Sequence, residues 1–308
     1  MRIVVALGGN ALLRRGEKPD ALVQRHHVRD AARALAPLAA AHDLIVCHGN
    51  GPQVGLLALE SESDRSLSRP YPLDVLVAQT QGMIGYWLAQ ELRNAGVQRP
   101  VVPVITQTMV RRDDPGFDRP TKFIGRIYPQ DEAREVASRL GWSVAPDGDA
   151  WRRVVASPEP VGIVEDVAVE ALVDARAVVV CCGGGGVPVV TGDGGLEGVD
   201  AVVDKDAVAA LLAIRFAADR LMILTDVAGL VRGFGTAAAT PIASLTTAEL
   251  AAMALPAGSM GPKAAACVRF TEHTGRPSVI GSLAEAGSLL SGSSGTTVVC
   301  GADAGSER

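Results

Sequence analysis

The chain is poor in aromatic residues and has no excess of positive charge. Aromatic residues make up 4% of its 308 residues, although 48% of all residues are hydrophobic. Its core must therefore be built from Ala, Val, Leu and Ile, which suits a buried parallel sheet flanked by helices. A net charge of −5, without a basic run, argues against nucleic acid or an anionic membrane as a partner.

Cysteines are few, and their spacing matches no metal site. They lie mostly in apolar runs, at Cys47, Cys181, Cys182, Cys267 and Cys300. An odd number of core-type thiols is typical of a reducing compartment. No apolar run reaches the roughly 18–20 residues of a membrane-spanning helix, and the first residues enter a strand without a signal peptide. We expect a soluble cytoplasmic protein.

Short β-branched runs alternate with Ala- and Leu-rich stretches, a pattern typical of βαβ units around a parallel sheet. We predict strands at 3–7, 44–47, 101–106, 177–182, 221–225, 278–281 and 296–300. We predict helices at 20–41, 52–67, 73–95, 206–217, 247–253 and 261–274. Pro37 is expected to end or kink the first helix early, because a proline inside a helix removes a hydrogen bond.

Residues 111–160 break this rhythm. The segment is rich in charged residues, Pro and Trp, with a helix expected at 129–140 and an extended stretch near 152–156. We interpret it as a lobe or lid inserted into the main α/β domain.

Three apolar strands run into glycine clusters, at Gly8-Gly9-Asn10, Gly49-Asn50-Gly51 and Gly183–Gly186. Ligands of open parallel sheets bind beyond the carboxyl ends of the strands. Glycines there let the backbone approach a phosphate, and free N–H groups donate to it. Each cluster alone could be a tight turn, but three on one sheet favour an anion site. None matches a P-loop or a dinucleotide fingerprint.

Lysine is scarce in this chain: Lys18, Lys122, Lys205 and Lys263 are the four examples among 29 basic residues. A kinase without a covalent intermediate positions two anionic substrates and neutralises the transferred phosphoryl group. Lysines serve this purpose as point charges. Lys122, Lys205 and Lys263 have unusual neighbours and are candidates for it, whereas Lys18 has the features of an ordinary solvated lysine.

Several polar residues near these features have both a functional and a structural interpretation. Asp204 and Asp206 flank Lys205 and could hold lysines in place or cap a helix. Asp226 follows a predicted strand, where it could meet a nucleotide or stabilise a turn. His48 precedes a glycine turn, but a structural role for it is the simpler interpretation.

Seven segments, in the same order along the chain, resemble the motifs of carbamate kinases within the amino-acid-kinase superfamily. They are VALGGNAL (5–12), HGNGPQVG (48–55), TQGMIGYWL (80–88), PTK (120–122), RRVVASP (152–158), VDKD (203–206) and GSMGPK (258–263). The resemblance spans nearly the whole chain. Asn10 also fits this family, since related acetylglutamate kinases usually carry a lysine there. Phe123 departs from the family, which commonly has proline after Thr-Lys; the loss of that ring loosens the backbone beside Lys122.

The resemblance implies an α/β fold: a three-layer αβα sandwich around a mainly parallel open sheet, with a small inserted lid. It implies a single domain over 1–308, with 111–160 as a protruding subdomain. The carbamoyl-phosphate side would lie mainly in 1–200 and the nucleotide side mainly in 201–308. The implied reaction is reversible phosphoryl transfer between carbamoyl phosphate and ADP, giving ATP and carbamate. A homodimer is implied, with Mg²⁺ held mainly by the phosphates of ATP or ADP.

The resemblance also assigns roles to residues. Lys122, Lys205 and Lys263 would contact the phosphates, and Asp206 would orient the lysines. Carbamoyl phosphate would lie in a cradle of Gly8, Gly9, Asn10, Gly49, Asn50 and Gly51. The nucleotide would meet Lys205, Asp226, Met260 and Lys263. Two alternatives remain: a kinase of this fold with another small acceptor, and a non-catalytic module that binds the same ligands.

Overall fold

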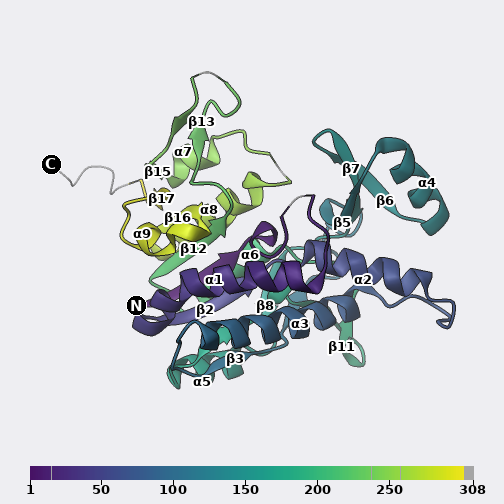
Figure 1. Ribbon diagram of the computed structural model, residues 1–308, viewed down its shortest axis with the longest axis horizontal. Helices are drawn as coiled ribbons and strands as arrows, with labels where there is room; N and C mark the ends of the chain where they lie inside the picture. Colours follow the sequence, from purple (N-terminus) through teal and green to yellow (C-terminus); the bar gives the residue numbers. More distant parts are fainter. Residues whose placement is uncertain (15, 237, 257, 302–308) are drawn as a thin grey trace.

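The protein is built on one eight-stranded, mainly parallel sheet (Figure 1). The computed structural model describes residues 1–14, 16–236, 238–256 and 258–301, without the side chain of Asn10. The strand order is β15-β17-β16-β12-β1-β2-β9-β3, and the pairing of β16 with β17 is the antiparallel one. The strands are β1 (Arg2–Leu7), β2 (Asp43–His48), β3 (Val101–Pro103), β9 (Val178–Val180), β12 (Arg220–Thr225), β15 (Ser244–Thr246), β16 (Ser278–Ser282) and β17 (Thr296–Val299).

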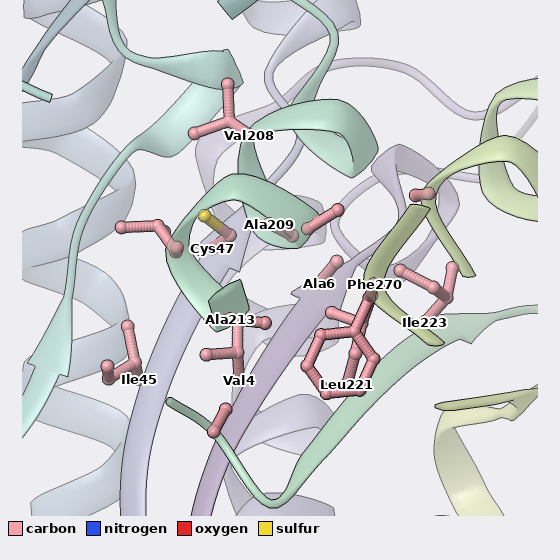
Figure 2. Packing of buried hydrophobic residues seen from close by; sticks show 14 of the residues in the cluster. Val4, Ala6, Ile45, Cys47, Val208, Ala209, Ala213, Leu221, Ile223 and Phe270 are labelled. Carbon is pink, nitrogen blue, oxygen red and sulfur yellow. The ribbon is translucent and has the colours of Figure 1, made fainter. Parts of the chain in front are cut away.

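Helices cover both faces of this sheet, which confirms the three-layer αβα fold. Side chains alternate along β1, so Ile3 and Val5 pack with α1 (Ala21–Ala41), α3 (Leu73–Asn94) and α9 (Ala286–Leu290). Val4 and Ala6 point to the opposite face, where α5 (Asp166–Asp174), α6 (Lys205–Arg215), α7 (Thr247–Ala251) and α8 (Met260–Thr274) pack. Figure 2 shows Val4 and Ala6 among side chains of α6 and α8.

Two sequence-based predictions about where an element ends were wrong. Pro37 does not end α1, which continues to Ala41 with Leu38 and Ala39 buried against the sheet. Burial of this apolar face outweighs the hydrogen bond that proline removes. The strand predicted at 101–106 ends at Pro103, because Thr106 leaves the sheet and its hydroxyl accepts a hydrogen bond from the Cys182 N–H.

A second sheet of four strands was not predicted. Its order is β11-β10-β4-β8, formed by β11 (Gly195–Gly198), β10 (Val187–Gly192), β4 (Gln107–Val110) and β8 (Pro160–Ile163). β4 and β8 flank the segment between them and pair antiparallel. The two ends of the segment between β4 and β8 therefore lie side by side in this second sheet.

Within that segment, three antiparallel strands and one helix form a lobe that stands apart from the main sheet (Figure 1). Its strands are β5 (Lys122–Tyr128), β6 (Ser143–Asp147) and β7 (Ala150–Val155), and its helix is α4 (Gln130–Leu140). β5 packs on α2 (Gly51–Ser63). At that contact Gly55 meets Gly125 so closely that a Cβ on Gly55 would lie 1.9 Å from the Gly125 Cα. Helix α2 ends at Ser63, four residues before its predicted end.

The remaining elements are short. They are the 3₁₀ turns η1 (Gly9–Ala11), η2 (Gly183–Gly185) and η3 (Leu283–Glu285) and the pair β13 (Val231–Arg232) and β14 (Thr240–Pro241). All five cysteines are free thiols. In the described parts of the chain, no helix combines the length and apolar character needed to cross a membrane.

Candidate active site

A pocket of about 190 Å³ lies beyond the carboxyl ends of β1 and β2 and is bounded on one side by the lobe. Segments far apart in the sequence line it together. The residues singled out by sequence that line the pocket are Gly9, Gly49, Asn50, Gly51, Lys122, Phe123, Gly184, Asp204, Lys205, Asp206 and Lys263. All three unusual lysines therefore converge on one cavity.

Backbone packing forms the floor of the pocket. Gly184 has a φ of +65°, and a Cβ there would lie 2.1 Å from the Asn50 Nδ2. Asn50 is buried, and its Nδ2 donates to the Thr80 hydroxyl at 2.8 Å. Glycine at 184 thus lets a positive-φ turn lie directly against a fixed amide. The Gly183–Gly186 cluster contributes to the pocket through this single residue, Gly184.

Asp206 lies between two of the lysines. Its Oδ1 is 2.5 Å from the Lys205 Nζ, and its Oδ2 is 3.2 Å from the Lys263 Nζ. Lys205 and Asp206 open α6, while Lys263 lies in the first turn of α8. Both helices therefore direct N-terminal N–H groups, with their partial positive charge, toward this end of the sheet. One carboxylate holds two ammonium groups beside them.

The electrostatics of the two lysines differ because their burial differs. Burial lowers the pKa of Lys205, and the Lys263 charge adds to that effect, although Asp206 partly opposes it. Burial also opposes the charged form of Lys263, but Asp206, together with smaller contributions from Asp204 and Asp226, outweighs burial and raises the Lys263 pKa. Both side chains have Asp206 as a carboxylate partner, which favours their charged forms beside the pocket.

The third lysine reaches the pocket from the lobe. Lys122 is the first residue of β5, and its Nζ pairs with the Asp204 carboxylate at the start of α6. The Asp204 Oδ1 also accepts the N–H groups of Asp206 at 2.8 Å and Ala207 at 3.3 Å, which makes Asp204 the N-cap of α6. Burial favours the neutral form of Asp204, but Lys122 and Lys205 outweigh it and lower the Asp204 pKa.

Two lobe residues in the pocket had no role assigned from the sequence. The Phe123 ring lies so close to Gly258 that a Cβ there would be 2.9 Å from its edge. The Arg152 guanidinium donates to the Gly125 carbonyl at 3.1 Å, pairs with Asp147 at 3.2 Å and faces the Phe123 ring. Arg152 is the first residue of the RRVVASP segment, which resembles a family motif, so the sequence contained a signal that could have identified it.

Three other residues assigned from the sequence are not among the residues that line the pocket. The Gly8 N–H donates to the Leu224 carbonyl, continuing the backbone contact between β1 and β12. Asp226 is exposed beyond β12, although its charge acts on Lys263. Met260 opens α8 and packs at the edge of the core. The Asn10 side chain lies outside the described part of the structure.

His48 is a buried structural residue beneath the pocket. Its Nδ1–H donates to the Gly49 carbonyl at 3.0 Å, and a Cβ on Gly183 would lie 2.2 Å from its Nε2. Burial lowers the pKa of His48 to about 4, helped by the Lys205 charge. The imidazole is therefore neutral at pH 7 and fills space between two glycine turns.

This burial should make the free energy of unfolding depend on pH. The His48 pKa is about 6.5 in the unfolded chain and about 4 in the folded protein, so only the unfolded chain takes up its proton as pH falls between those values. We expect His48 alone to remove about 2 kcal/mol of stability between pH 7 and pH 5. Urea unfolding of the wild type and His48→Asn at both pH values measures this. An equal loss in both proteins would contradict the assignment.

The chain is similar over nearly its full length to known proteins. Residues 1–282 match the amino acid kinase family. The chain is 46% identical over 302 residues to the carbamate kinase of Rhizobium meliloti (strain 1021), covering 97% of this chain and 93% of that relative. It is 47% identical over 296 residues to the carbamate kinase of Escherichia coli (strain K12), covering 96% and 98%.

Solved structures agree with these relatives. Carbamate kinase from Giardia lamblia bound to citric acid superposes with a TM-score of 0.91 at 37% identity, covering 97% of this chain and 98% of that one. The same Giardia enzyme bound to AMP-PNP gives a TM-score of 0.86 over the same coverage. With three lysines gathered at the glycine-lined ends of a parallel sheet, these similarities show that the chain belongs to the amino acid kinase family and, within it, to the carbamate kinases.

Proposed function

We propose that Lys122, Lys205 and Lys263 bind and stabilise the phosphoryl group as it moves between carbamoyl phosphate and ADP in this carbamate kinase. The observation that carries this assignment is their convergence, from three separate segments, on one pocket. Transfer of a phosphoryl group requires little besides positioning and stabilisation of negative charge. Three ammonium groups over a floor of backbone amides supply both, without a covalent intermediate.

Each part of the pocket has a task in this proposal. Gly9, Gly49, Asn50 and Gly51 cradle carbamoyl phosphate through close backbone approach. Asp206 orients Lys205 and Lys263, since its two oxygens pair with both. The fixed ammonium groups need no reorganisation when charge moves toward the bridging oxygen of the nucleotide, which is the main benefit of a preorganised polar site.

We assign the two substrates to opposite sides of the pocket. Residues 111–160 form a protruding subdomain over carbamoyl phosphate, whose site lies mainly within 1–200. The nucleotide lies mainly on residues 201–308, where Asp226 and Met260 accompany Lys205 and Lys263. The Asp226 charge acts on Lys263, and Met260 begins the helix that carries that lysine. The Giardia relative bound to AMP-PNP supports a nucleotide site in this fold.

An ATP-using kinase generally requires a divalent cation, and we assign Mg²⁺ to the nucleotide phosphates. The pocket carboxylates Asp204 and Asp206 already pair with lysines. Across the described residues, no group of three or more His, Cys, Asp or Glu side chains is placed to hold a metal ion. A Mg²⁺ ion held by the nucleotide phosphates, which Lys205 and Lys263 would bind, fits these residues. It would supply neutralisation of the nucleotide phosphates.

The direct test is ATP formation by the purified protein from Mg²⁺-ADP and carbamoyl phosphate, followed with a coupled assay. We expect turnover far above the spontaneous background, and its loss when EDTA is in excess over Mg²⁺. No ATP above background would refute the reaction. Transfer from ATP to a different small acceptor would favour the same fold with another substrate, and tight ADP binding without transfer would favour a binding module.

We further propose a cytoplasmic homodimer that associates near the edge strand β3. Tyr86 on α3 and Ile105 after β3 are 53% and 55% exposed, and α3 packs on β3. The apolar Val161 on β8 and Val167 on α5 are exposed as well. Exposed apolar side chains on adjacent elements are typical of an interface. Sedimentation should give twice the chain mass, and Ile105→Asp should give a monomer. A wild-type monomer at micromolar concentration would exclude the dimer.

A further inference from the structure

One carboxylate connects the lobe to the helix that carries the central lysine. Asp204 uses Oδ1 to cap α6 and Oδ2 to pair with the Lys122 Nζ of the lobe. The two side chains are partly enclosed, with 20% of Asp204 and 27% of Lys122 exposed. The contact joins residues 82 positions apart in the sequence.

Repulsion among the pocket cations gives the ion pair between Asp204 and Lys122 a role besides the capping of α6. Lys205 and Lys263 already share Asp206, so a third ammonium group entering the pocket meets two like charges. Charges a few ångströms apart in a partly closed site repel strongly unless a counter-charge is present. Asp204 supplies that counter-charge on the side where Lys122 enters, and one donor of the Lys122 ammonium serves it while two remain for a ligand.

We infer that Asp204 is a positioning residue that holds Lys122 over the carbamoyl-phosphate site before substrate arrives. This rests on the proposed function of Lys122 and adds a residue to it. The lobe is attached to the body through α2, and Lys122 lies at its edge next to the pocket. Without Asp204, Lys122 turns away from the other lysines, and carbamoyl phosphate must draw it back.

The competing explanation is that Asp204 serves α6 alone, as an N-cap. Asparagine separates the two roles, because its side-chain oxygen caps a helix as well as aspartate does but carries no charge for Lys122. Asp204→Asn therefore removes the attraction to the lobe and retains the cap. Lys122→Met removes the other partner and completes a double-mutant cycle.

The experiment measures kcat and KM for carbamoyl phosphate and for ADP in the wild type, Asp204→Asn, Lys122→Met and the double variant. We expect Asp204→Asn to lower kcat/KM for carbamoyl phosphate roughly 30-fold, mostly through KM, with KM for ADP little changed. In the Lys122→Met background the same substitution should cost less than about 3-fold. Equal losses in both backgrounds, or tighter carbamoyl-phosphate binding by Asp204→Asn, would overturn the inference.

A second readout needs no substrate. Hydrogen–deuterium exchange of the ligand-free protein should become faster at residues 122–128 in Asp204→Asn and in Lys122→Met, while the first turn of α6 exchanges as in the wild type. Faster exchange confined to α6 would assign Asp204 to capping. If the wild type formed no ATP from carbamoyl phosphate, the proposed function would fail, and the exchange data would still decide whether Asp204 holds the lobe.

Discussion

Lys205→Met should lower kcat by about 1000-fold or more and leave the protein folded. Lys205 is nearly enclosed, with 9% of its side chain exposed, and it lines the pocket beside its partner Asp206. Methionine matches its length but supplies no charge where negative charge is redistributed in the transition state. The coupled ATP-formation assay measures the loss. Circular dichroism and thermal unfolding test the fold.

The matched control is Lys18→Met, which removes an exposed lysine outside the pocket. It should leave kcat within about 2-fold of the wild type, as expected for a surface substitution. The Tm of Lys205→Met should be lower than that of the wild type, because the buried Asp206 carboxylate then keeps only Lys263 as a partner. A loss in kcat smaller than about 10-fold would remove Lys205 from the proposed reaction.

Gly55→Ala should lower kcat/KM for carbamoyl phosphate by about 100-fold through displacement of the lobe. The added Cβ would lie 1.9 Å from the Gly125 Cα and 2.2 Å from the Gly125 N. Backbone atoms cannot yield as a flexible side chain can, so β5 must move away from α2 and carry Lys122 with it. A displacement of about 1 Å can cost a factor of 100 in rate. ADP binding, measured by calorimetry, should change little because Lys205 and Lys263 are not on the lobe.

Gly82→Ala is the matched control for this substitution. Gly82 lies inside α3, and a Cβ there meets no atom within 4 Å. Alanine should stabilise that helix by up to about 1 kcal/mol and leave activity unchanged. Wild-type kcat/KM in Gly55→Ala would show that the contact of the lobe with α2 does not place Lys122.

Local patterns predicted seven of the eight strands of the main sheet and most of its helices, but they missed β15, α5 and α9. The β-branched runs of β1, β2 and β12 are short and bounded by glycine or polar turns, so their secondary structure is evident from a few residues. Local patterns did not predict which strands pair with one another in the second sheet. β4 and β8 were missed because they are short and pair across more than 50 residues, and no local pattern encodes such a partner.

For the candidate site, too, local sequence features identified some residues, but the contacts between distant segments were not predicted. Scarcity and unusual neighbours singled out Lys122, Lys205 and Lys263, and their flanking motifs indicated the kinase family. Phe123 was noticed only as the loss of a proline, whereas its ring reaches Gly258 on the opposite side of the pocket. The roles of Arg152 and of the Gly55–Gly125 contact depend on distances between segments, which spacing along the chain does not reveal.

The sequence by itself determined the α/β class with a parallel sheet, the glycine-lined strand ends and the three candidate lysines, because each follows from residue type and short-range order. Only the tertiary structure decided that Asp206 pairs with two lysines while Asp204 pairs with the third. The two carboxylates are two residues apart and chemically identical. Their different partners arise from the direction in which α6, α8 and the lobe present each side chain.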